Sequence, residues 1–157
     1  MPESEKNRVS DQCWKEWISK KAVANAGVVV INFKKQVLVL FKPKNQEWEI
    51  PSGAIDKDEE PDDAAVRELR EETHISLSRE QLTQLGVVTA CHPKPKYPED
   101  KTDVIVTFMA NSNGRVVLGD EGHTMFQWLS REEIDKTTIP MHPMTRIQIR
   151  MAYEKIQ

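Results

Sequence analysis

Residues 53–75 read GAIDKDEEPDDAAVRELREETHI and combine a glycine, an acidic run and a stretch with a helical pattern. Pro61 suits the first position of a helix, because the backbone N–H that proline lacks would have no partner there. Asp62 and Asp63 then place negative charge at the positive end of the helix dipole. The sequence therefore predicts a helix that begins at Pro61.

Three glutamates of this helix, Glu68, Glu71 and Glu72, are spaced at i, i+3 and i+4 and so share one face. Like charges on one face repel each other by roughly 0.2–0.5 kcal/mol per pair. A divalent cation that prefers oxygen ligands would offset this repulsion. Val66 and Leu69 are expected to pack inward from the flank. The pattern indicates a metal site on one face of a packed helix.

The spacing of these residues resembles the signature of the Nudix hydrolase family, G-x5-E-x7-R-E-U-x-E-E-x-G-U, in which U is a bulky aliphatic residue. The matching positions are Gly53, Glu59, Arg67, Glu68, Leu69, Glu71, Glu72 and Ile75. Six fixed Gly, Glu and Arg positions, at a background frequency of about 7% each, match by chance roughly once in ten million registers. His74 replaces the second glycine. Because histidine tolerates positive φ better than most residues, we expect some strain there and an intact metal face.

The resemblance implies an α/β fold, the Nudix α/β/α sandwich, in which a mixed curved sheet lies between helices. It also implies bound Mg²⁺ or Mn²⁺. The residues that it assigns as metal ligands are Glu68, Glu71, Glu72 and the backbone carbonyl of Ser52, which replaces a glycine in the W-x-hydrophobic-P-G-G stretch that leads into the signature. One of the glutamates, or Glu121, would help to deprotonate water. Gly53, Glu59 and Arg67 would support the site.

Other interpretations of the acidic stretch compete with this one. An acidic helix is usually only a solvated surface, which the signature match argues against. Asp56, Asp58 and Glu60 imitate the first ligands of a calcium EF-hand loop, but that loop needs glycine at its sixth position and glutamate at its twelfth. Pro61 and Arg67 stand there, which excludes calcium sensing. A Nudix-like module that binds nucleotides without turnover stays open.

Length and composition bound the remaining classes. The 157 residues fit a single domain spanning 1–157. A net charge of −3 lacks the basic balance of a nucleic-acid-binding protein, so no nucleic-acid partner is expected. Because the first residues are polar and no apolar run approaches 18 residues, we expect no signal peptide, no membrane partner and a cytoplasmic location. Cys13 and Cys91 lie too far apart to suggest a zinc site or disulfide.

The rest of the chain predicts strands and short helices around this stretch. An amphipathic helix is expected at about 10–21, where Trp14 and Trp17 could pack on the domain or in a homodimer, or alternatively stack on a base. Strands are expected at 24–33, 36–41, 84–91, 103–110 and 126–130, and helices at 131–135 and 144–156. Asn113-Gly114 predicts a tight turn that returns the chain through a strand at 116–118.

Five side chains outside the signature are candidates for substrate binding. Lys42 and Lys44 follow a predicted strand and could hold the outer phosphates. Residues 92–102, HPKPKYPEDKT, predict a loop in which Lys94, Lys96 or Tyr97 could meet phosphate or base. Solvated surface positions are the alternative for both groups.

Glu121-Gly122-His123 precedes a Trp-Leu pair, and this arrangement resembles the late segment of many Nudix hydrolases. In those proteins an acidic residue at this point joins the metal site or serves as base, which implies the role given to Glu121. Asp120 and His123 are close enough in sequence to take that role instead.

The resemblance implies hydrolysis of a nucleoside diphosphate linked to another group, which loops outside the signature select. The family's NADH pattern, S-Q-P-W-P-F-P-x-S, is absent. A proline typical of ADP-ribose hydrolases, about fifteen residues past the signature, is absent too. We therefore expect a small-molecule nucleotide substrate, either a nucleoside triphosphate or a dinucleoside polyphosphate. The alternatives are an ADP-ribose or nucleotide-sugar pyrophosphatase, a non-catalytic nucleotide sensor, and an isomerase of isoprenoid diphosphates.

Overall fold

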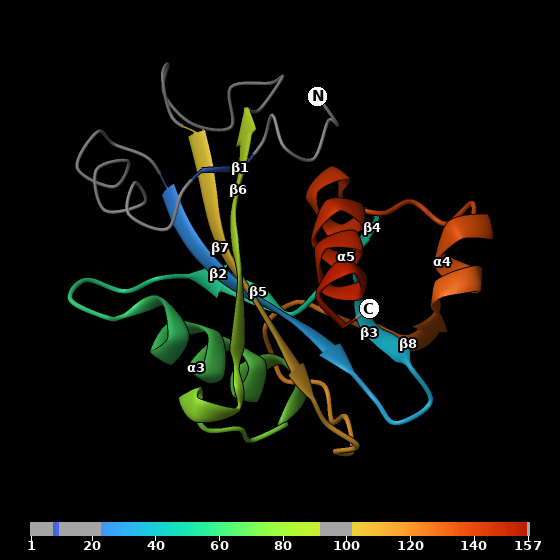
Figure 1. The fold of residues 1–157 in the computed structure, drawn as a ribbon, viewed down its shortest axis with the longest axis horizontal. Coiled ribbons are helices and arrows are strands. Elements are labelled where there is room, and N and C mark those ends of the chain that lie inside the picture. The colour runs from blue at the N-terminus through green and yellow to red at the C-terminus, as the bar shows by residue number, and fades with distance from the viewer. Residues whose placement is uncertain (1–7, 10–22, 92–101, 157) are drawn as a thin grey trace.

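The computed structural model describes residues 8–9, 23–91 and 102–156, in which eight strands form one mixed sheet (Figure 1). The strands are β1 (Arg8–Val9), β2 (Val23–Ile31), β3 (Gln36–Lys42), β4 (Glu47–Glu49), β5 (Ser52–Ala54), β6 (Thr83–Cys91), β7 (Thr102–Asn111) and β8 (Met125–Ser130). The helices are α3 (Pro61–Thr73), α4 (Arg131–Lys136) and α5 (Pro143–Ile156), with a 3₁₀ turn, η1, at Arg79–Gln81. These bounds confirm the predicted strands at 24–33, 36–41, 84–91, 103–110 and 126–130 and all three predicted helices in this part of the chain, within two residues at each end. The helix expected at 10–21 lies outside the described residues.

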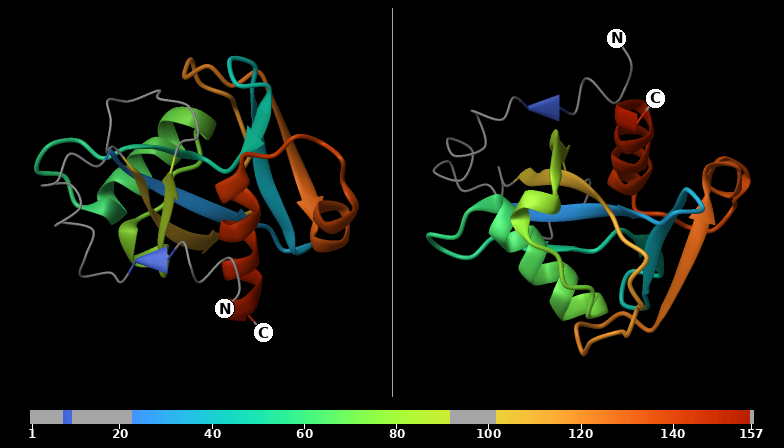
Figure 2. Two further views of the ribbon diagram at one scale, coloured as in Figure 1. Left: turned by 90° about the horizontal axis from the view of Figure 1, so that it is seen from above. Right: turned by 60° about the horizontal axis from the view of Figure 1, so that its bottom comes forward.

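The central strand, β2, is apolar on both faces. Val28 and Val30 contact the cluster beneath α3, whereas Val29 and Ile31 contact the cluster beneath α5, and all four side chains are at most 1% exposed. A strand of this kind has to be covered on both sides. Figure 2 shows α3 and α5 on opposite sides of the sheet. The predicted α/β/α sandwich is therefore confirmed.

The sheet is mixed because β2 runs parallel to β7 along its whole length, whereas the other pairs are antiparallel. The pairing of β2 with β3 is confined to Ile31 and Val37. Beyond that pair the strands splay apart. β5 takes the place beside β2, with Gly27 opposite Ser52 and Ala26 opposite Gly53. The splay therefore brings the residues that precede the acidic stretch into the middle of the sheet.

Helix α3 packs on the sheet through small residues. Ala64, Ala65 and Leu69 are fully buried, whereas Val66, which we expected to face inward, is only half-buried. The two alanines let the helix axis approach the sheet closely, and this approach leaves Val66 on the flank. The same inward side continues into Glu72, which is 2% exposed.

The turn and strand predicted at 113–118 are wrong. Gly114 lacks the positive φ that a two-residue hairpin turn requires, and no strand is found at 112–119. Residues 116–119 instead form a strap across the C-terminal end of α3. The Val117 N–H donates to Thr73 O at 2.9 Å, and the Gly119 N–H donates to Glu72 O at 3.0 Å. The strap thereby satisfies carbonyls that a helix end leaves without partners.

Candidate active site

Arg67 is the centre of an ion-pair network that ties the loop before α3 to the helix. Its Nε and Nη2 donate to the two carboxylate oxygens of Glu59, each at 2.9 Å, and Nη2 also donates to Ala54 O at 2.9 Å. Its Nη1 donates to Glu68 at 2.8 Å and to Glu71 at 3.2 Å. The hydrogen bond from Arg67 holds the pKa of Glu59 below its ordinary value. Glu59 and Arg67 thus lie where a supporting role requires them.

Glu72 is a buried carboxylate whose two oxygens have different surroundings. Its Oε1 accepts a hydrogen bond from the Ser52 N–H at 3.2 Å, whereas Oε2 has no hydrogen-bond partner among the described residues. Burial raises the pKa of Glu72 to about 9, and the negative charges of Glu49 and Glu68 act in the same direction. An unpartnered buried oxygen is costly, so this atom is a natural ligand for a cation.

The buried Glu72 makes the stability of the metal-free protein depend on pH. The pKa of Glu72 is near 4.5 in the unfolded chain and about 9 in the folded protein. The folded protein therefore binds more protons than the unfolded chain at pH values between these two. The free energy of unfolding therefore falls as pH rises through this window. We expect urea unfolding in EDTA to show the wild type losing at least about 1 kcal/mol relative to Glu72→Gln between pH 5.5 and 8.5. Parallel stabilities of the two proteins would contradict this.

His74 adopts the backbone conformation that its position demands. Its φ is 62°, in the left-handed region, as expected for the residue that replaces glycine past the helix end. Its ring adds a contact that the sequence did not reveal: Nδ1 donates to Val117 O at 2.6 Å. The hydrogen bond offsets part of the backbone strain and attaches the strap to the helix end.

The segment after the strap brings two further side chains to the glutamates. Glu121 is exposed. Burial raises the pKa of Glu68, and the negative charges of Glu71 and Glu121 add to this rise. His123 is buried, with Nδ1 3.3 Å from Glu72 Oε2 and Nε2 3.2 Å from Glu49 Oε1. Asp120 is exposed. The structure therefore places Glu121 near one of the glutamates and His123 against another.

The sequence reasoning missed Glu49. The available signal was alternation: Trp48 and Ile50 are both buried in the cluster beneath α5, so Glu49 between them faces the other side of β4. Only the fold shows that this other side faces Glu72.

The candidate lysines differ in their surroundings. Lys42 is half-buried at the end of β3, and its charge opposes the rise in the pKa of Glu72, so it lies close to the site. Lys44 is exposed in the turn that follows. Lys94, Lys96 and Tyr97 lie outside the described residues.

The donor set suits a hard cation. It combines the three glutamates of α3 with Ser52, whose N–H contacts Glu72, and includes Glu72 Oε2, which has no hydrogen-bond partner among the described residues. Gly53 fits the arrangement because a Cβ there would lie 2.1 Å from Glu68 Cδ. Among residues 23–91 and 102–156 no three acidic, His or Cys groups converge as they would around an ion, since Glu68 and Glu71 turn to Arg67. The assignment of Ser52, Glu68, Glu71 and Glu72 as ligands stays a prediction.

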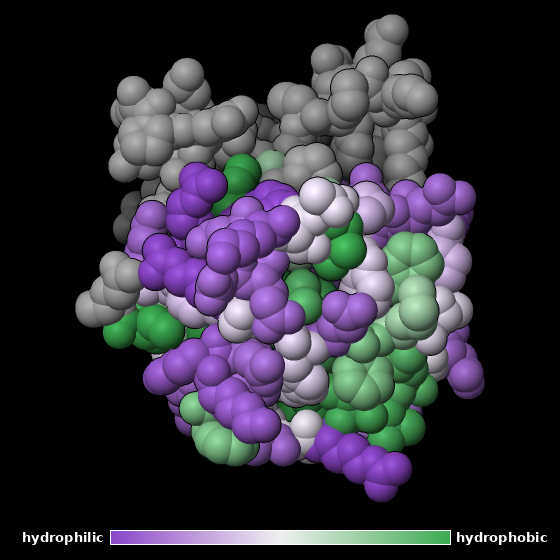
Figure 3. Space-filling view, turned by 90° about the vertical axis from the view of Figure 1, so that its right-hand side faces the viewer, coloured by the Kyte–Doolittle hydropathy of each residue, from purple (hydrophilic) through white to green (hydrophobic). Residues whose placement is uncertain are grey.

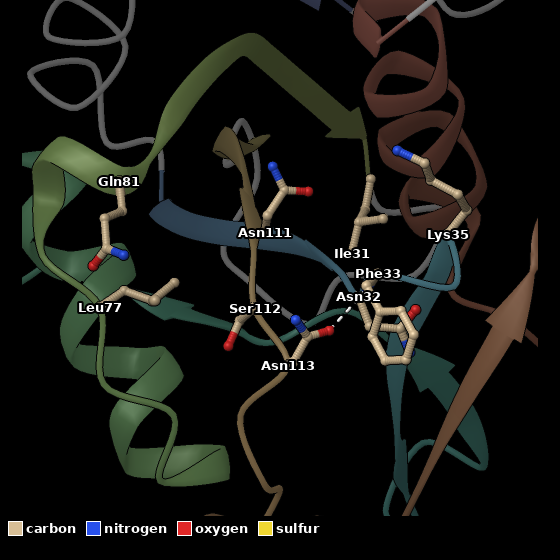
Figure 4. Close-up of a pocket in the computed structure, with 9 residues that line it drawn as sticks. All are labelled: Ile31, Asn32, Phe33, Lys35, Leu77, Gln81, Asn111, Ser112 and Asn113. Carbon is tan, nitrogen blue, oxygen red and sulfur yellow. Dashed lines mark hydrogen bonds between the residues drawn. The ribbon is translucent and has the colours of Figure 1, made fainter.

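Two other surfaces lie outside this cluster. A hollow of about 520 Å³ opens where β2 and β7 end (Figure 4). It lies about 13 Å along β2 from Gly27, the residue that pairs with Ser52 beside the acidic cluster. In this hollow, the Asn32 side chain accepts hydrogen bonds from the Lys34 and Gln36 N–H groups, and the Asn113 side chain accepts one from the Phe33 N–H. On the face that Figure 3 shows, apolar side chains gather toward the lower right. Met125 and Phe126, on β8, are 48% and 41% exposed.

Comparison with known proteins supports the sequence resemblance. The family model for the NUDIX domain matches residues 21–148. An RNA pyrophosphohydrolase of Ruthia magnifica subsp. Calyptogena magnifica is 45% identical over 63 residues, which are 40% of this chain and 34% of that protein. The chain thus spans about a third of that relative. A putative 8-oxo-dGTP diphosphatase of Bacillus subtilis is 26% identical over 116 residues, which are 73% of this chain and 71% of that protein.

Solved structures share the fold. The NUDIX domain of Shewanella oneidensis NrtR, complexed with ADP ribose, has a TM-score of 0.71 at 18% identity, covering 92% of this chain and 99% of that one. A C. elegans Ap4A hydrolase has a TM-score of 0.65 at 24% identity, covering 86% and 98%. The signature, the sandwich and the match over residues 21–148 agree: this chain belongs to the Nudix hydrolase family.

Proposed function

We propose that this protein is a metal-dependent pyrophosphohydrolase that cleaves the diphosphate linkage of a nucleoside diphosphate joined to another group. The observation that supports this most is the buried Glu72, which lies on the same helix face as Glu68 and Glu71 and whose Oε2 has no hydrogen-bond partner among the described residues. A carboxylate buried in this way is expensive unless a ligand uses it. A solvated acidic helix would have no reason to bury it.

The chemistry follows from the charge of the substrate. A diphosphate linkage is strongly anionic and repels an attacking nucleophile. Glu68, Glu71, Glu72 and the Ser52 carbonyl would hold Mg²⁺ or Mn²⁺, which would supply charge neutralisation and a more acidic water when bound. Glu121, exposed beside Glu68, is proposed to accept the proton of the attacking water. Lys42 is proposed to hold an outer phosphate.

Nucleoside triphosphates and dinucleoside polyphosphates are the proposed substrates. The relative named 8-oxo-dGTP diphosphatase, which aligns with 73% of the chain, supports the first class. We propose a small-molecule partner and no nucleic acid. One specific alternative is RNA with a 5′-triphosphate end, because relatives that match 40% of the chain are named RNA pyrophosphohydrolases.

None of the helices among the described residues has the length and apolar character of a membrane span. A homodimer and a cytoplasmic location also stay proposals.

A panel assay tests the proposed function. The purified protein is incubated with either Mg²⁺ or Mn²⁺. Each incubation contains one substrate class: nucleoside triphosphates, dinucleoside polyphosphates, nucleotide sugars, isoprenoid diphosphates or 5′-triphosphate RNA. We expect metal-dependent cleavage of a nucleoside triphosphate or dinucleoside polyphosphate, lost in EDTA. Preferred cleavage of ADP-ribose or of RNA would replace the substrate class. Stoichiometric nucleotide binding without phosphate release would overturn catalysis in favour of the sensor.

The space beside Gly53 gives a sharper test of the site. A methyl group in Gly53→Ala would displace the Glu68 carboxylate, the movable end of a side chain, so stability should change by less than about 1 kcal/mol. We expect kcat to fall about a hundredfold, since a shift of about 1 Å in a positioning group can cost this much. Gly114→Ala is the matched control, because its Cβ meets only side chains, at 3.1 Å or more. Equal kcat values for the two variants would contradict the prediction.

A further inference from the structure

His123 bridges two carboxylates that come from distant parts of the chain. Its Nδ1 lies 3.3 Å from Glu72 Oε2 and its Nε2 lies 3.2 Å from Glu49 Oε1. The side chains of His123, Glu49 and Glu72 are 5%, 19% and 2% exposed. A ring buried between two acids forgoes the hydration of three polar groups, so packing alone does not account for it.

The backbone on both sides of His123 is fixed. Gly122 has a φ of 95°, which favours glycine, and the Thr124 N–H donates to Phe41 O at 3.1 Å. Glu49 is equally constrained, because it lies opposite Leu40 in the pairing of β4 with β3. The imidazole is therefore held between a rigid strand and the buried end of Glu72.

The hydrogen-bond geometry leaves a specific opening. Glu72 Oε2 and His123 Nδ1 are close, yet neither has an aligned hydrogen-bond partner within the described part of the chain. The contact to Glu49 through Nε2 is a hydrogen bond. The ring is thus anchored on the Glu49 side, and on the other side it faces the oxygen that would turn to a cation.

We infer that His123, anchored by Glu49, is a positioning residue that sets the orientation of the Glu72 carboxylate and thereby the affinity of the site for its divalent cation. The inference rests on the proposed function for the role of Glu72 as a ligand. Ligating carboxylates are commonly held by hydrogen bonds from a second layer of residues, whose loss costs 10–100-fold in metal affinity. The sequence alone offered His123 only as a substitute for Glu121.

Two variants of similar size separate the two contacts of the ring. The side-chain amide of His123→Asn reaches the position of Nδ1 and keeps a donor for Glu72. That of His123→Gln reaches toward Nε2 and keeps only Glu49. If the ring merely filled space, both replacements would disturb the site alike. The readouts are Mn²⁺ affinity, measured by electron paramagnetic resonance of the free ion without substrate, and urea unfolding.

We expect His123→Gln to bind Mn²⁺ at least about tenfold more weakly than the wild type, with kcat reduced more than KM is changed. His123→Asn, which keeps the contact to Glu72 but loses the Glu49 anchor, should bind Mn²⁺ at least about threefold more tightly than His123→Gln. Equal affinities for the two variants, whether weakened or not, would overturn the inference. A measurement on the wild type covers the case in which neither variant folds: saturating Mg²⁺ should shift the ¹⁵N resonance of His123 Nδ1, and an unchanged resonance would also overturn it.

Failure of the inference is distinguishable from failure of the proposed function. A wild type that hydrolyses nucleotides while both variants bind Mn²⁺ alike refutes only the role of His123. If His123→Gln binds Mn²⁺ more weakly than His123→Asn but the wild type cleaves no phosphate anhydride, only the proposed hydrolysis is refuted.

Discussion

Replacing Glu72 with glutamine is expected to lower kcat on the preferred nucleotide by about a thousandfold while the protein stays folded. The amide keeps the shape of the side chain, and its carbonyl still accepts the Ser52 N–H, but the negative charge is lost. The metal-free variant should be at least as stable as the wild type, because burial disfavours the ionised carboxylate. Initial-rate assays with Mg²⁺ and urea unfolding in EDTA measure the two effects.

Glu80→Gln is the matched control for this change. Glu80 lies in η1, exposed and outside the acidic cluster, so the same loss of one charge should leave kcat within about twofold. Full activity of a folded Glu72→Gln protein would remove Glu72 from the site. Loss of folding in EDTA would show that the carboxylate is needed for the structure.

The second large effect is expected at Gly119 in the strap. A Cβ there would lie 2.0 Å from the backbone oxygen of Glu71, and backbone cannot move aside as a side chain can. Gly119→Ala should therefore cost about 2–3 kcal/mol of unfolding free energy, since overpacked sites relax only by shifting their surroundings. The variant should also lose activity, because the strap leads directly to Glu121 and His123.

Urea unfolding of Gly119→Ala and Gly114→Ala side by side measures this cost. Both glycines lie in the same connection, and neither has a positive φ, so the two changes remove similar backbone freedom. A loss in Gly119→Ala below about 1 kcal/mol would mean that the strap detaches from α3 without consequence.

Much of the site could be predicted from sequence because its signal is local. The glutamates, Arg67 and Pro61 lie within one helix and the loop before it, where fixed spacings translate directly into a shared face. The left-handed backbone at His74 followed from the same local pattern. These features need no knowledge of how distant segments meet.

The parts that failed depend on contacts between distant residues. His123 meets Glu49 across 74 positions of the chain, and His74 meets Val117 across 43, which no periodicity encodes. The residues at 116–118 have the apolar composition of a strand, but the N–H groups of Val117 and Gly119 instead donate to carbonyls at the end of α3. The prediction that Val66 faces inward was wrong because Ala64 and Ala65 pack against the sheet instead and leave Val66 on the flank of the helix.

The strap also makes assembly of the site conditional on completion of the helix. The N–H groups of Val117 and Gly119 find their acceptors only after Glu72 and Thr73 have joined α3. Opening of the last helical turn would therefore release the strap that leads to Glu121, so the last turn and the strap should exchange their amide hydrogens as one cooperative unit. The chemistry of the site would then be switched off by a local unfolding event well before the domain as a whole melts.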